Sequence, residues 1–151
     1  MADSVRLQIL KAMKLKLQGV SNVAEVSYGF IPMSTVTQFP TICMVPMQTP
    51  YRPLTNTEYT TGADRNTADG WPVAVIGYVK CSTGPENFTD AMEDLLKDIF
   101  TVLLADHTLG LSSYVNNCYL MSTDTEIDVQ RNVGAVVATF AIKYDFTKGS
   151  P

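Results

Sequence analysis

The sequence predicts an α+β domain: a mostly antiparallel or mixed sheet with two helices packed on one face. Three observations lead to this fold class. Two segments repeat apolar residues at a period of about 3.6, which is typical of helices with one buried face. Five shorter runs are rich in apolar, β-branched and aromatic residues, as strands are. The order is helix, strands, helix, strands, and this segregation favours α+β over an alternating parallel sheet.

The first helix is predicted over residues 4–18 and ends at Gly19. Most of its apolar side chains share one face, as in a helix that packs on a core. Leu7 and Leu15 fall outside that face and lie beside lysines. We therefore expect this helix to contact something beyond its own core, with Leu7 and Leu15 as candidate partner-interface residues.

Three strands are predicted next, at residues 23–30, 41–45 and 73–79. Apolar residues in the second and third do not alternate with polar ones, which is typical of strands covered on both faces. One domain of this size has few helices to provide that cover. We expect a neighbouring subunit to supply the second layer.

A long polar segment, residues 47–71, separates the second strand from the third. Loops of this length are usually functional or disordered, and a long two-stranded β-arm is an alternative. Aromatic and arginine side chains dominate protein interfaces. The segment's candidate partner-interface residues are therefore Tyr51, Arg52, Tyr59, Arg65 and Trp71. A surface excursion with no partner is the other interpretation.

The second helix has the clearest pattern. Thr83 and Glu86 have the spacing of a capping box, and Pro85 suits the first helical turn. Apolar residues from 88 to 103 follow the 3.6 period, with acids opposite. We expect this helix to end within residues 106–110.

The two helices carry opposite charge. Residues 1–20 hold four basic residues and one acidic residue, a net charge of +3. Residues 83–106 hold six acidic residues and one basic residue, a net charge of −5. Complementary helix faces of this kind meet either within one subunit or between neighbours, and the sequence leaves both open.

Two C-terminal strands are predicted at residues 115–121 and 133–146, separated by an extended or looped acidic segment. The last strand alternates apolar and polar residues, so one of its faces is expected to be buried. In an extended segment, a period of two puts Asp124, Glu126 and Asp128 on one face. This acidic row is either an ordinary solvated edge or the acidic lining of a lumen.

The chemistry of single residues gives little support to an enzyme. Cys43, Cys81 and Cys118 are odd in number and scattered, which indicates reduced, buried thiols. A thiol enzyme would need one of them beside His107, and apolar surroundings raise a thiol pKa. We expect no enzymatic activity, no cofactor and no metal. A small thiol-dependent or cofactor-binding enzyme and a small-molecule binding module are the less favoured alternatives.

Length, composition and charge set further bounds. The chain has 151 residues, a net charge of −4 and a pI of about 4.8. This size suits a single domain over residues 1–151. The acidic balance argues against binding to DNA phosphates or to an anionic membrane surface. Five charges interrupt the longest helical apolar stretch, residues 88–105, so no membrane span is expected.

Several segments together resemble phage tail terminators, the small proteins that cap a finished tail tube and join it to the head. The resemblance covers most of the chain and none of it is a catalytic signature. It lies in the opening helix, the long polar insertion, the acidic amphipathic helix, "FPTICMVP" (residues 39–46), "WPVAVIGYVK" (71–80) and "VGAVVATFAIKYDF" (133–146).

The resemblance implies a structural virion protein of the tail or neck, assembled in the host cytoplasm as a homo-oligomeric, hexameric ring. Its implied partners are the tail tube protein and the head-completion or connector protein, with DNA passing through the ring without specific binding. Six copies at −4 would carry −24, and an acidic wall repels DNA in transit. The resemblance also implies that residues 47–71 reach the tube or the connector. Another head–tail neck or tail-completion protein is the main alternative.

Overall fold

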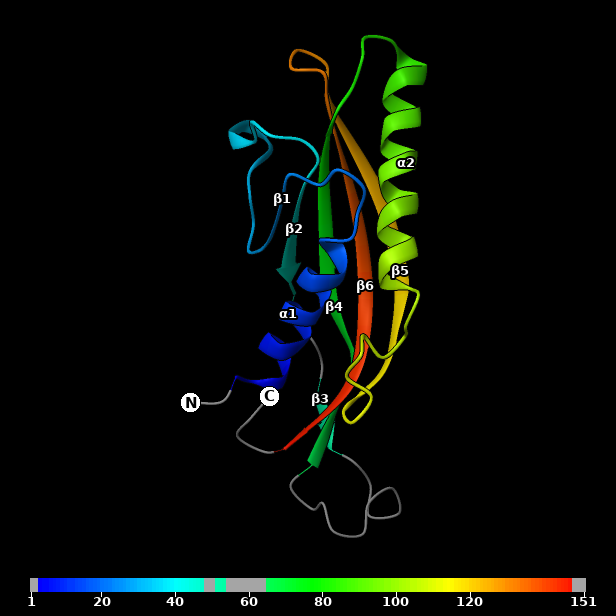
Figure 1. Ribbon diagram of the computed structural model, residues 1–151. Helices are drawn as coiled ribbons and strands as arrows, with labels where there is room; N and C mark the ends of the chain where they lie inside the picture. The colour runs from blue at the N-terminus through cyan, green and yellow to red at the C-terminus, as the bar shows by residue number, and fades with distance from the viewer. Residues whose placement is uncertain (1–2, 48–50, 54–64, 148–151) are drawn as a thin grey trace.

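The protein is a mixed β-sheet with two helices on one face, which confirms the predicted α+β class (Figure 1). The computed structural model describes residues 3–47, 51–53 and 65–147. Its elements, in chain order, are α1 (Val5–Leu17), β1 (Glu25–Tyr28), the 3-10 turn η1 (Met33–Thr35), β2 (Thr41–Pro46), β3 (Tyr51–Pro53), β4 (Arg65–Lys80), α2 (Pro85–Leu103), β5 (Val115–Asp128) and β6 (Val133–Thr147). Neither helix of this described part is long and apolar enough to cross a lipid bilayer.

The strands follow the order β1-β2-β4-β6-β5, and β3 pairs with the first part of β4. β1 and β2 are parallel, whereas the other pairs are antiparallel. β4 and β6, of 16 and 15 residues, form the central pair and run the length of the molecule in Figure 1. β5 is therefore a long edge strand.

Both helices pack on the same face of the sheet, which we call the helix face. One core cluster joins Ile9 and Met13 of α1 to Leu96 and Ile99 of α2 over the central strands. α1 is N-capped by Ser4, whose hydroxyl accepts a hydrogen bond from the Leu7 backbone N–H. This packing buries the apolar stripe that the helical period predicts.

The opposite face of the sheet, the outer face, is partly covered by the same chain. Residues 29–40 fold over Cys43 and Tyr78 and form a small second core with them. Figure 1 shows η1 and α2 on opposite sides of the sheet. The neighbouring subunit that the sequence analysis expects as a second cover is therefore not needed over this part of β2 and β4.

The predicted loop at residues 47–71 is in part β-structure. β4 begins at Arg65, so residues 65–71 belong to a strand, and β3 pairs with Asn66–Ala68. This pairing favours the two-stranded arm over a structureless loop. Residues 54–64, with Tyr59 among them, lie outside the described residues.

Other predicted boundaries also change. α2 ends at Leu103 and not within residues 106–110. The acidic segment after residue 121 is strand as far as Asp128, because it pairs with β6 throughout. The N-cap of α2 is Gly84, at φ +122°, and no side chain caps this helix. The predicted capping box of Thr83 and Glu86 is thus wrong, although Pro85 does lie in the first turn.

Candidate functional site

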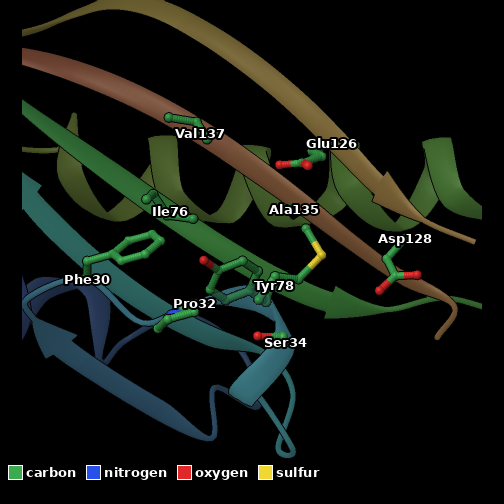
Figure 2. A pocket seen from close by; sticks show the side chains of 10 residues that line it. Phe30, Pro32, Ser34, Ile76, Tyr78, Glu126, Asp128, Ala135 and Val137 are labelled. Carbon is green, nitrogen blue, oxygen red and sulfur yellow. The ribbon is translucent and has the colours of Figure 1, made fainter. Parts of the chain in front are cut away.

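A groove of about 390 Å³ lies on the outer face, beside residues 29–40, which cover the neighbouring part of that face (Figure 2). Its floor comes from the central strands β4 and β6 and is largely apolar. The floor residues are Ile76, Tyr78, Ala135 and Val137. The walls come from residues 30–34 on one side and from the end of β5 on the other.

The acidic row forms the β5 side of this surface. Its three carboxylates pair in register with alternate residues of β6, Val137, Ala135 and Val133. Directly opposed residues of an antiparallel pair share one face of the sheet. The one-face placement of Asp124, Glu126 and Asp128 is therefore confirmed. Glu126 and Asp128 line the groove, and Asp124 lies next along the strand outside its lining.

The opposite wall is apolar and is held by an arginine from the far end of the chain. Phe30 is 62% exposed and stands at the edge of the groove. The Arg131 guanidinium donates to the carbonyl oxygens of Met33 and Val36, each at 2.6 Å. A planar guanidinium can satisfy two acceptors at once, so Arg131 ties the β5–β6 turn to this wall.

Tyr78 connects the floor to the same wall. Its hydroxyl donates to the Ile31 carbonyl oxygen at 2.5 Å. Burial, with smaller contributions from Cys43 and the Glu126 carboxylate, raises the pKa of Tyr78 to about 12. The hydroxyl is therefore protonated at neutral pH and serves as a donor that fixes the wall.

The exposed side of α1, on the helix face, carries a second surface whose charge is opposite to that of the groove. Leu7, Lys11, Lys14 and Leu15 occupy positions i, i+4, i+7 and i+8, which lie on one side of a helix; we call them the α1 stripe. Leu15 is 71% exposed, whereas Leu7 is half-buried.

Within the described part of the subunit, the two lysines of the α1 stripe contact exposed partners, Asp3 and Tyr28. The Lys11 ammonium lies 2.6 Å from an Asp3 carboxylate oxygen, and this hydrogen bond with the charge of Asp3 raises the pKa of Lys11. The Lys14 ammonium lies 5.6 Å from the centre of the Tyr28 ring. Exposed pairs of this kind contribute little to stability, so both ammonium groups can exchange partners at low cost.

Trp71 is not the surface anchor that the sequence analysis predicts. Its ring is fully buried, packs edge-on against Tyr144 and lies under the Arg6 guanidinium. The aromatic ring instead fills the core where α1 crosses the sheet. Of the other arm residues, only the backbone of Tyr51, Arg52 and Arg65 is described, as strand, and Tyr59 lies outside the described residues.

The three thiols lie in the protein interior. Cys81 and Cys118 belong to the main core and Cys43 to the small outer core. Burial raises the pKa of all three thiols, that of Cys118 to about 12. His107 is exposed beyond the end of α2. Over the described part of the chain, no three His, Cys, Asp or Glu side chains gather as a metal site.

We expect the native thiols to resist alkylation. A pKa near 12 instead of the ordinary 9.0 leaves on the order of a thousandfold less thiolate at Cys118, and burial adds steric protection. Iodoacetamide at pH 8, followed by mass spectrometry, should label all three cysteines in denaturant and none rapidly in the native protein. Rapid native labelling of Cys81 would favour the thiol-enzyme alternative.

Sequence reasoning missed the apolar wall and its arginine. The signal available was weak: Phe30, Ile31 and Met33 are apolar residues in a connection between two strands. The contact that gives them a role joins Met33 to Arg131, 98 residues away along the chain. No local period predicts a contact at that separation.

The fold and these two surfaces define a small α+β protein with unlike exposed surfaces on opposite faces of one sheet. Comparisons with known protein families and with curated proteins found no match.

Proposed function

We propose that this chain is a structural virion protein of the tail-terminator kind. It assembles as a ring on the tail tube, ends tail elongation and offers the surface to which the head connector attaches. The proposal starts from the sequence resemblance. The resemblance is to proteins in which two helices flank a sheet, and the mixed sheet with two helices on one face supports the proposal at the level of the fold.

One observation carries the proposal further: the chain has two unlike exposed surfaces on opposite sides of its sheet. The α1 stripe combines leucines with lysines, and the groove combines an apolar floor with carboxylates. Exposed apolar side chains grouped with charge are typical of protein–protein interfaces. A protein with unlike surfaces on opposite faces can meet a different neighbour on each side, as a ring subunit must.

The proposed ring also has a charge that suits the passage of DNA. Six copies at −4 give −24 for the ring. DNA phosphates are repelled by such a wall, so the DNA would pass without being held. The acidic row projects from the outer face on the edge strand and is the candidate lining of this passage.

The test is removal of the gene from the phage genome that carries it. Electron micrographs of the deletion should show overlong, headless tails, and a plasmid copy of the intact chain should restore tails of normal length joined to heads. Unjoined heads beside tails of normal length would instead indicate a head-side neck protein. Normal virions from the deletion would overturn the proposal.

A further inference from the structure

We propose that the α1 stripe of one copy docks in the groove of the next copy, and that this contact repeats around the ring. The inference rests on the ring of the proposed function and names the two surfaces that build it. The proposed occupant of the groove is α1 of a second copy of this chain.

The two surfaces match in both apolar character and charge. In the α1 stripe, Leu15 lies one helical turn from Lys11 and next to Lys14. In the groove, an apolar floor lies beside the Glu126 and Asp128 carboxylates. A leucine over the floor therefore brings the lysine ammonium groups to the acidic side. Lysine stems are long and flexible, so their charged ends can reach carboxylates at the rim while the stems cover apolar surface.

The exposed aromatic ring at the other edge of the groove favours a helix as the occupant. Phe30 is 62% exposed and stands opposite the acidic row. A helix laid between them would cover this ring with apolar side chains and face the acids with basic ones. An amphipathic helix in a groove is a recurrent mode of recognition.

The acidic surface of α2 is the other possible site for the α1 stripe, and it fits less well. Glu93 and Asp94 are exposed there. However, no large apolar side chain within Pro85–Leu103 is exposed, so α2 has charge without an apolar floor. The groove offers both.

The placement of the two surfaces sets the kind of assembly. The α1 stripe lies on the helix face and the groove on the outer face. A two-fold contact would use the same patch on both copies, which this pair of surfaces does not allow. The contact is instead head-to-tail, and a head-to-tail contact closes into a ring when its rotation permits.

This contact divides the acidic row between two roles. Glu126 and Asp128 line the groove and would meet the lysines of the next copy. Asp124 does not line the groove, and it is the member of the row left for the DNA passage.

Cysteine cross-linking tests the contact directly. Leu15→Cys on one chain and Ser34→Cys on a second, differently tagged chain place exposed thiols on the α1 stripe and the groove wall. The three native thiols are buried and add little background. A short bismaleimide should join these two chains in concentrated mixtures. Leu15→Cys with Glu93→Cys, on the exposed face of α2, is the matched control and should give little product. Equal yields, or no product from the first pair, would overturn the contact.

Charge exchange provides the second test. The pair Lys11→Glu and Lys14→Glu should weaken assembly on the order of tenfold or more, and so should the pair Glu126→Lys and Asp128→Lys, because like charges then face each other. A chain with all four changes should assemble again, whereas the pair Glu93→Lys and Asp94→Lys should have no effect. Sedimentation measures the assembled fraction.

The outcomes separate the contact from the proposed function. If rings form and all charge exchanges leave them unchanged, this contact is wrong and the ring can still be a tail terminator. If the four-change chain reassembles as expected but deletion of the gene leaves normal virions, the contact stands and the proposed function is wrong.

Discussion

Replacing Trp71 with alanine is expected to lower the free energy of unfolding by about 3–5 kcal/mol. The ring is fully buried and lies 5.8 Å, between ring centres, from Tyr144. The Arg6 guanidinium lies 4.3 Å from the centre of the Trp71 ring. The Trp71 Nε1–H donates to the Met47 carbonyl oxygen at 3.0 Å. Truncation would leave a cavity in the core beside α1. Urea denaturation should show a lower midpoint with an unchanged slope.

Trp71→Phe is the matched control, since it keeps an aromatic ring and removes the indole N–H. We expect it to lose less stability than Trp71→Ala, because most of the apolar contact remains. A surface anchor would behave differently: its removal would weaken binding to a partner and hardly change stability. An unchanged midpoint for Trp71→Ala together with failed head–tail joining would therefore restore the interface role and contradict the burial described above.

The periodic elements were the most predictable part of this fold. The 3.6 period places the buried residues of α2, from Phe88 to Leu103, and the period of two places the helix-face residues of β6 from Val136 to Tyr144. It does not account for Val133 and Ala135, which the outer core buries on the opposite face. Both patterns arise because burying one side of a regular element requires a regular repeat of apolar residues. The start of α2 was less predictable, because apolar periodicity does not identify the cap. Gly84 is the N-cap, immediately before the first helical residue, and has a positive φ. The capping-box pattern predicts neither this position nor this conformation.

The start of β4 at Arg65 was not predicted, because the residues before Val73 are mostly polar. Polar residues such as Thr67 and Asp69 are typical of loops. The first part of β4 nevertheless pairs with β3 on one side and with β6 on the other. The Thr67 hydroxyl donates to an Asp145 carboxylate oxygen at 2.8 Å across the β4–β6 pair. Pairing between distant strands thus decides the structure of this segment, and local composition does not report it.

The candidate site was predictable only on one side. The acidic row follows from alternation alone, since side chains two residues apart in a strand share a face. The other wall depends on residues 29–40 folding over β2 and β4, and on Arg131 reaching that segment. The apolar runs of β2 and β4 predict cover on both faces, but the cover comes from the same chain and not from another subunit. The apolar run of a strand reports burial without identifying the covering chain.

The close approach of α2 to the sheet depends on glycine at the contact. A Cβ atom at residue 77 would lie 2.7 Å from Leu95 Cδ2 and 3.2 Å from Val136 Cγ2. Gly77 can be replaced only if its neighbours move, because such distances are below ordinary van der Waals contact. The Leu95 side chain therefore occupies the space that the glycine leaves open, and the two positions should be coupled in their effect on stability.

Leu95→Ala is expected to cost about 2–5 kcal/mol of the free energy of unfolding, because it leaves a cavity between α2 and β4. Gly77→Ala alone should cost about 1–3 kcal/mol through overpacking. In the Leu95→Ala background, the same methyl group fills part of the cavity and should cost less. The coupling between the two substitutions, measured by urea denaturation, should be about 0.5–3 kcal/mol in the compensating direction. Additive losses would show that Leu95 does not pack over Gly77 and that another contact sets the position of α2 on the sheet.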